Sequence, residues 1–157
     1  MQSFPLTDVG HAVKDVIANA QQDASGDTII LTAGATEDAV ECEGETIDRL
    51  GFDSMKLVIG YITTLTDAKA LSFGIKEQQS DDGSTWDTAT VVQAATAAVT
   101  SDGGGTEMGT VEANINLRSK KRYVRYNITP DLSATGTDTA IWTAVAILGG
   151  AVELPTS

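Results

Sequence analysis

The side chains that most often carry catalysis are scarce in this sequence. His11 is the only histidine and Cys42 the only cysteine among the 157 residues. A serine or cysteine nucleophile needs a base that the fold positions and a third group that orients the base. A single cysteine also rules out an internal disulfide and metal sites built from several thiolates. We therefore predict no catalytic residue and no cofactor, and we expect that the protein is not an enzyme.

Acidic side chains gather at Asp81-Asp82-Gly83. Calcium takes six to eight oxygen ligands, and the loops that supply them space their acids as D-x-D-x-D-G with a glutamate further on. That spacing is absent, so no metal site is predicted. The surrounding SDDGSTW, Ser80 to Trp86, is similar to the Asp-box hairpin of sialidase propellers, S-x-D-x-G-x-T-W, but it is one residue short and occurs once. The pattern predicts a tight hairpin whose Trp86 packs into the core.

The two tryptophans, Trp86 and Trp142, are the residues that could form an aromatic platform for sugars. Both lie in predicted strands among apolar neighbours, so we predict that they pack in the core. A carbohydrate-binding sandwich is the alternative, and burial of both indole rings would exclude a sugar platform.

The charge balance limits the partners of this protein. Twenty-two acidic and ten basic residues give a net charge of −12. This charge repels nucleic acids and anionic membrane surfaces over about a Debye length of ~8 Å, so we expect neither as a partner. The sequence also has no basic start followed by an apolar leader, and no run of the roughly 18 apolar residues that span a bilayer. We expect it to be made and kept in water.

Half of the basic residues fall within eight positions, as Arg118, Lys120, Lys121, Arg122 and Arg125. One interpretation of this basic cluster is a solvated turn followed by the outer face of a strand. The other is a contact patch for an acidic neighbour, such as a second copy of this chain.

The elements that must position these side chains are β-strands. Leu71, Phe73 and Ile75 alternate with smaller or polar residues, which is the period-two pattern of a strand with one buried face. The strands that patterns of this kind predict are 28–33, 55–65, 71–75, 86–92, 111–117, 122–129 and 139–148. Strands joined by polar turns, without helices between them, predict an all-β fold: an antiparallel β-sandwich of the jelly-roll kind, or a barrel.

Two of the predicted strands, 55–65 and 139–148, are largely apolar on both faces. Such strands are typical of the centre of a sheet that is covered on both sides. The short turn 66–69 joins the first of them to the strand at 71–75, so we expect these two strands to pair as antiparallel neighbours. The glycine-rich stretch 101–105 predicts a mobile surface loop.

The N-terminal segment predicts either a short amphipathic helix or an extended arm. Apolar residues recur at helical spacing as Val9, Val13, Val16, Ile17 and Ala20. Thr7 or Asp8 can cap such a helix. Several residues in the segment are indifferent helix formers, so an arm that orders on a partner is the alternative. The predicted organisation is an arm or helix at 1–20, a β-sandwich domain at 21–150 and a C-terminal tail at 151–157.

Two stretches of the sequence resemble small virion proteins of tailed bacteriophages. Leu71 to Thr88 reads LSFGIKEQQSDDGSTWDT, and Arg122 to Gly150 begins RYVR and ends in a threonine-rich strand with a glycine pair. In that family a strand L-x-F-x-I-x-E runs into S-x-D-G-x-T-W, and a later strand begins R-Y-V-R. The resemblance implies a capsid decoration or cement protein, a β-sandwich or jelly roll that sits on the outside of the capsid.

The resemblance also implies partners and a location. The protein would be made in the host cytoplasm, bind the major capsid protein on the capsid exterior, and lock neighbouring capsomers as a homo-oligomer, a dimer or trimer. The residues that we predict to contact partners are Phe4, Pro5, Leu6, Val9 and Val13 in the arm and Arg118, Lys120, Lys121 and Arg122 in the basic cluster. The alternatives are a tail tube or other tail structural protein and a carbohydrate-binding module.

Overall fold

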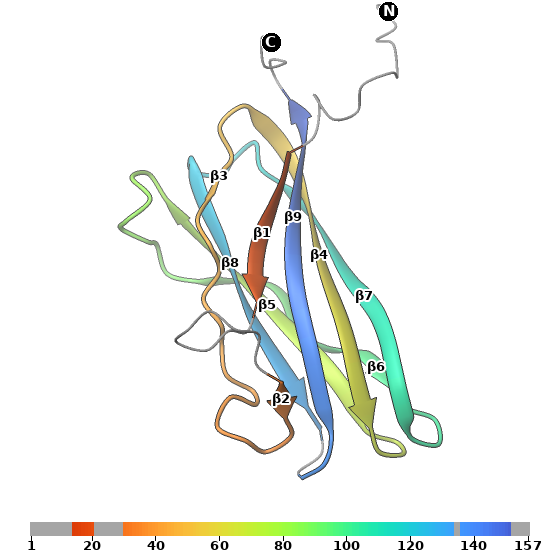
Figure 1. Ribbon diagram of the computed structural model, residues 1–157. Coiled ribbons are helices and arrows are strands. Elements are labelled where there is room, and N and C mark those ends of the chain that lie inside the picture. Colours follow the sequence, from red (N-terminus) through yellow and green to blue (C-terminus); the bar gives the residue numbers. More distant parts are fainter. Residues whose placement is uncertain (1–13, 21–29, 134–135, 152–157) are drawn as a thin grey trace, which may run out of the picture.

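The chain folds into two antiparallel β-sheets packed face to face (Figure 1). The computed structural model describes residues 14–20, 30–133 and 136–151. Its nine strands are β1 (Lys14–Ala20), β2 (Leu31–Thr32), β3 (Ile47–Asp48), β4 (Phe52–Leu65), β5 (Ala70–Ser80), β6 (Thr90–Thr100), β7 (Gly105–Asn116), β8 (Tyr123–Leu132) and β9 (Thr139–Ala151). The described ranges form no helix, and so none that could cross a membrane.

The strand order separates the molecule into two layers. One sheet runs β1-β9-β4-β7, with β2 also paired to β9, and the other runs β3-β8-β5-β6. All of the strand pairs are antiparallel. The predicted antiparallel β-sandwich is therefore confirmed.

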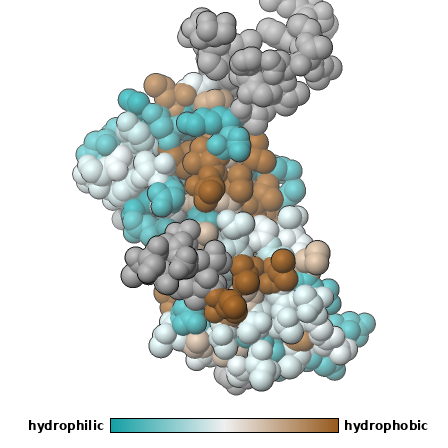
Figure 2. All heavy atoms as spheres, in the orientation of Figure 1, coloured by the Kyte–Doolittle hydropathy of each residue, from teal (hydrophilic) through white to brown (hydrophobic). Residues whose placement is uncertain are grey.

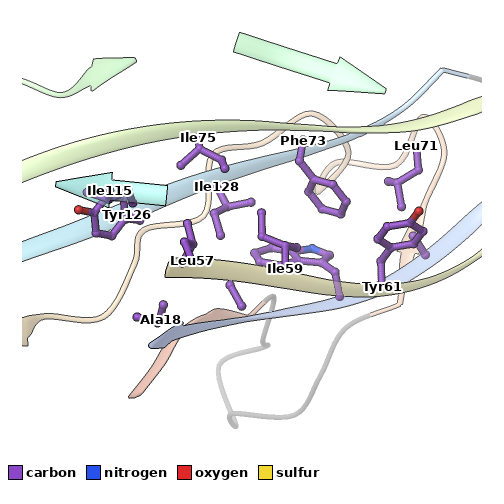
Figure 3. Close-up of a cluster of buried hydrophobic side chains, with 14 of the residues drawn as sticks. Ala18, Leu57, Ile59, Tyr61, Leu71, Phe73, Ile75, Ile115, Tyr126 and Ile128 are labelled. Carbon is purple, nitrogen blue, oxygen red and sulfur yellow. The ribbon is translucent and has the colours of Figure 1, made fainter. Parts of the chain in front are cut away.

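Side-chain alternation along the strands builds the core between the two sheets. Figure 3 shows Ile59 of β4 pointing toward Phe73 and Ile75 of β5, and all three side chains are buried. Trp142 of β9 meets Phe73 edge-on, with 6.0 Å between ring centroids. Each large apolar side chain buried in this way contributes roughly 1.5–3 kcal/mol, so the inner faces hold the two layers together.

The predicted pairing of 55–65 with 71–75 is wrong. β4 and β5 lie in opposite sheets, and the short turn between them crosses from one layer to the other. Both strands direct their large apolar side chains into the same core, where Leu57 and Leu71 are fully buried. The apolar side chains of both strands are buried by packing against each other across the core. The backbone hydrogen bonds of β4 go to β7 and β9, and those of β5 go to β6 and β8.

The N-terminal helix is wrong over residues 14–20, which form β1 and pair antiparallel with β9. Val16 and Ile17 are β-branched residues that fit a strand. A ladder of backbone hydrogen bonds to β9 outweighs the weak helical periodicity. The remaining parts of the predicted arm and tail, residues 1–13 and 152–157, lie outside the described residues.

The predicted hairpin is confirmed with different bounds. β5 pairs with β6, but β6 begins at Thr90, so Trp86 lies in the connecting loop 81–89. β6 continues through the small residues up to Thr100, and β7 begins at Gly105, which leaves a turn at 101–104. Alanine and glycine have low strand propensity, and neighbouring strands that supply hydrogen-bond partners override it here.

Two short strands also differ from the predictions. The strand predicted at 28–33 is represented among the described residues by β2 alone, at Leu31–Thr32. The segment 37–45 contributes an isolated bridge from Cys42 to Ile128, and β3 follows at Ile47–Asp48, where no strand is predicted.

β4 and β9 hold the centre of their sheet, as predicted, but only their inner faces are covered. On the opposite face, Ile62 of β4 is 54% exposed and Ile141 of β9 is 42% exposed. The expected cover on both sides is therefore absent from the described part of the chain.

Candidate interaction surface

The outer face of the β1-β9-β4-β7 sheet carries apolar side chains in cross-strand register. Val58 of β4 pairs with Val145 of β9, and Ile62 pairs with Ile141. Directly opposed side chains on one face of an antiparallel pair lie about 4.5–5.5 Å apart at Cβ, so each of these pairs forms a contact. The two central strands thus contribute a strip of two apolar pairs along the middle of the sheet, with Thr143 opposite Gly60 between them.

The flanking strands extend this strip in both directions. Ile17 of β1 pairs with Val145, and Met108 of β7 pairs with Ile62. Ile17 is 65% exposed and Met108 is 75% exposed. We call this surface the apolar outer face, and its residues are Ile17, Val58, Ile62, Met108, Ile141 and Val145.

A shallow groove of about 730 Å³ crosses the apolar outer face. Gly60 lies within it, and a Cβ added there would meet nothing within 4 Å, so the missing side chain leaves open space. In Figure 2, hydrophobic atoms gather over β1, β9 and β4 on the face toward the viewer. Exposed apolar patches mark interaction sites in proteins, and here Thr143 opposite Gly60 separates the two apolar pairs of the central strands.

Polar groups at the border of the apolar outer face satisfy one another. Lys56 Nζ lies 2.6 Å from Glu112 Oε2 at one end of the strip. At the other end, the hydroxyls of Thr64 and Thr106 are 3.2 Å apart. The border therefore adds little net charge to the face, which suits contact with another protein.

The basic cluster lies at the turn between β7 and β8 and in the start of β8, and it is paired within the chain. The ion pairs join Arg118 to Asp53, Lys120 to Glu77, Lys121 to Asp81 and Asp87, and Arg122 to Asp48. Asp87 and Asp81 raise the pKa of Lys121 above its usual value. This arrangement agrees with the turn-and-strand interpretation, and a contact role for the cluster stays a prediction.

The pair of Lys120 and Glu77 belongs to a buried network in the other sheet. Glu77 is 2% exposed and accepts hydrogen bonds from Tyr126 Oη at 2.9 Å, Lys120 Nζ at 2.8 Å and Gln79 Nε2 at 2.9 Å. Burial and the adjacent carboxylate raise the pKa of the Tyr126 phenol. With these three donors satisfying the carboxylate, the network ties the β7–β8 turn to the sheet and gives Glu77 a structural role.

The tryptophans have different environments. Trp142 is 2% exposed and lies in the core, as predicted. Trp86 is half-buried outside the core, with the Arg125 guanidinium 4.4 Å from its ring centroid. The prediction that Trp86 packs into the core is therefore wrong, and a sugar platform made of both indoles is excluded.

The loop that carries Trp86 is organised by Asp82. Its carboxylate accepts hydrogen bonds from the backbone N–H groups of Thr85 at 2.7 Å and Ser84 at 2.8 Å and from the Ser80 hydroxyl at 2.9 Å. These bonds, that of Thr85 first, hold the pKa of Asp82 well below its usual range. The loop thus folds on its own side chains, which explains why Trp86 does not enter the core.

The remaining candidate residues for chemistry or binding are Cys42, the possible metal ligands, His11 and the predicted contact residues of the arm. Cys42 is half-buried, and burial raises the pKa of its thiol. Across the described ranges, no three His, Cys, Asp or Glu side chains group as metal ligands would. The residues that lie outside the described part are His11 and the predicted contact residues Phe4, Pro5, Leu6, Val9 and Val13.

Sequence reasoning missed the apolar outer face although its signal was present. The signal was the apolar character of both faces of 55–65 and 139–148, which was interpreted as double cover. Met108 lies in a stretch for which the sequence predicts no strand, and Ile17 lies in the segment predicted as a helix or an extended arm. Only the register of β1, β4, β7 and β9 brings these side chains onto one surface.

The sequence matches no protein-family model and no curated protein. Solved structures resemble the fold. The VP2 subviral particle of infectious bursal disease virus aligns with a TM-score of 0.50 and 9% identity over 91% of this chain and 34% of that chain. T=1 particles of a mutant VP2 from the same virus align with a TM-score of 0.50 and 11% identity, over 91% of this chain and 33% of that chain. A third structure is the CBM22-1 and GH10 modules of a Clostridium thermocellum xylanase in complex with xylohexaose. It aligns with a TM-score of 0.48 and 13% identity, over 94% of this chain and 28% of that chain.

This chain spans about a third of the length of the viral proteins it matches. At such low sequence identity the likeness shows the fold alone. The protein is a jelly-roll β-sandwich whose fold is similar to a domain of a viral capsid protein.

Proposed function

We propose that this protein is a structural component of a virion, a decoration or cement protein that binds the major capsid protein on the outside of a tailed-phage capsid. The resemblance of 71–88 and 122–150 to small phage virion proteins supports this proposal. The similarity of the sandwich to a domain of the VP2 capsid protein is consistent with it at the level of the fold.

The observation that carries the proposal is the apolar outer face on a strongly acidic chain. A net charge of −12 opposes nonspecific aggregation of free molecules, because like-charged surfaces repel. The apolar outer face offers a surface with few charges, which is the composition found in the buried centre of protein interfaces. Such a protein does not aggregate before a complementary protein surface is available, and a decoration protein must avoid aggregation before shells assemble.

Substitution of Ile17 by lysine tests this proposal. Ile17 is 65% exposed, so Ile17→Lys leaves the core intact, but shell binding would then bury an ammonium group without a partner. We expect binding to purified shells that lack this protein to weaken by more than about tenfold, which is roughly 1.4 kcal/mol. Co-sedimentation of protein with shells over a range of concentrations measures this effect.

Val91→Lys is the matched control, because Val91 is a 67% exposed aliphatic residue on β6, in the other sheet. This variant adds the same charge and should decorate shells like the unmodified protein. Equal decoration by Ile17→Lys and Val91→Lys would contradict the assignment of the apolar outer face. Rings or tubes formed by the purified protein would support the tail-tube alternative instead.

A further inference from the structure

The described part of each sheet has two edges, and three of these four edges are poorly suited to pairing with another chain. β3 has two residues. β1 has seven residues with a bulge between Ile17 and Asn19, and the two-residue β2 also pairs with β9. β6 is longer, but its register against β5 shifts at three places. Short edges and bulges are devices by which proteins prevent a sheet edge from adding further strands.

β7 is the exception. Its 12 residues pair one to one with β4, from Gly105 opposite Leu65 to Asn116 opposite Ser54, with no irregularity. The strand contains no proline and no lysine, and no described strand pairs with its other side. Figure 1 shows β7 as the outermost strand of its sheet. An edge of this length presents a regular row of unpaired backbone donors and acceptors to a partner strand.

We propose that β7 pairs antiparallel with β7 of a second copy of this chain, with Met108 at the two-fold axis. The two sandwiches then share one continuous sheet of order β1-β9-β4-β7-β7-β4-β9-β1. This inference concerns the backbone edge of β7 and does not rest on the proposed binding to a capsid, although Met108 also belongs to the apolar outer face.

The apolar row of the sheet selects this register. Ile141, Ile62 and Met108 lie side by side across β9, β4 and β7. With Met108 opposite Met108 of the second copy, the row continues without interruption into the same three residues of that copy. Met108, 75% exposed in the single chain, gains an apolar neighbour directly across the new pair.

The charges of β7 are compatible with the same register. Glu107 faces Gly109 of the second copy, and Thr106 faces Thr110, so no acid opposes an acid. Glu112 lies beyond the paired part of β7, which runs from Gly105 to Val111 in this register, and Lys56 offsets its charge at 2.6 Å. This matters because each copy carries a net charge of −12 and like charges directly opposite each other destabilise a strand pair.

The first test is the mass of the protein in solution, measured by sedimentation equilibrium over a range of concentrations. We expect twice the chain mass of 16.3 kDa. Met108→Lys places two ammonium groups opposite each other and should weaken dimerisation by more than about tenfold, since like charges that face each other across an interface repel. Val91→Lys, on the bulged edge of β6, should leave the dimer intact. A monomeric unmodified protein, or a dimer lost with Val91→Lys and retained with Met108→Lys, would overturn the proposal.

The second test probes the register by disulfide formation. In a Cys42→Ser background, Met108→Cys should form a cross-linked dimer on mild oxidation, because opposed residues in antiparallel strands have Cα atoms about 4.5–5.5 Å apart, within the range of disulfides. Thr110→Cys is the control. In the proposed register Thr110 of one copy lies opposite Thr106 of the other copy, so two Thr110→Cys thiols are too far apart to form a disulfide. Equal cross-linking of both variants on a non-reducing gel would refute the register.

Discussion

Glu77 shows how a single buried charge can determine local structure. A carboxylate removed from water is costly unless hydrogen bonds compensate it, and here Tyr126, Lys120 and Gln79 supply them. Lys120 was predicted to contact a partner, and its Nζ lies 2.8 Å from this internal carboxylate. Stability of the β5–β8 pair and the position of the β7–β8 turn therefore depend on one network.

We predict that Tyr126→Phe lowers the free energy of unfolding by about 1–3 kcal/mol, because it leaves a buried carboxylate with one donor fewer. Urea denaturation followed by tryptophan fluorescence measures the change. Tyr123→Phe is the control, since Tyr123 is half-buried and its ring contacts the Arg122 guanidinium at 4.9 Å, outside the core cluster. Equal effects of the two substitutions would contradict the role of the network.

The raised pKa of Tyr126 gives this prediction a dependence on pH. The unfolded chain loses the phenolic proton near the ordinary pKa of 10.0, whereas the folded chain retains it to higher pH. The unfolded state therefore binds fewer protons above pH 10, and the free energy of unfolding falls as the pH rises through that range. This part of the alkaline destabilisation should be absent from Tyr126→Phe.

At the scale of elements, β1 joins the N-terminal segment to the sandwich. Ala18 is fully buried, and the side chain of Asn19 donates hydrogen bonds to the carbonyl oxygens of Cys42 at 2.9 Å and Tyr126 at 3.3 Å. β1 also covers one edge of β9. The strand therefore ties the two sheets together and is part of the folded domain, whereas residues 1–13 precede it.

Two truncations separate these parts of the chain. Removal of residues 1–13 keeps all of β1 and, if the arm contacts the capsid as predicted, should abolish binding to shells. Removal of residues 1–20 should lower the unfolding temperature, because it exposes the edge of β9 and deletes the contacts of Ala18 and Asn19. Differential scanning calorimetry measures the unfolding temperature, and co-sedimentation measures binding to shells. A truncation at residue 13 that decorates shells normally would contradict a binding role for the arm.

At the scale of the whole molecule, the net charge of −12 opposes any contact between copies. Salt shortens the Debye length from about 30 Å at 0.01 M to about 8 Å at 0.15 M, so it screens this repulsion. We predict that the dissociation constant of the proposed dimer decreases over this range. Sedimentation at several salt concentrations measures it. A dimer weakened by salt would indicate instead that the basic cluster binds the acidic surface of the neighbouring copy.

The sequence by itself determined most of the strand content of this protein. The alternation of Leu71, Phe73 and Ile75 and the apolar strands at 55–65 and 139–148 are local patterns, and a period of two is a property of each strand alone. The absence of helices between strands then indicated a sandwich. The excess of acidic residues likewise follows from the sequence alone.

Only the tertiary structure decided which strands are neighbours and which faces meet water. β4 and β5 lie in opposite sheets despite their short link, and residues 14–20 pair with β9 although their spacing favoured a helix. A strand that is apolar on both faces is compatible with double cover or with an exposed binding face, and the pattern is the same in both cases. Hydrogen-bond partners and burial come from residues distant in the chain, so these features emerge only when the sheets assemble.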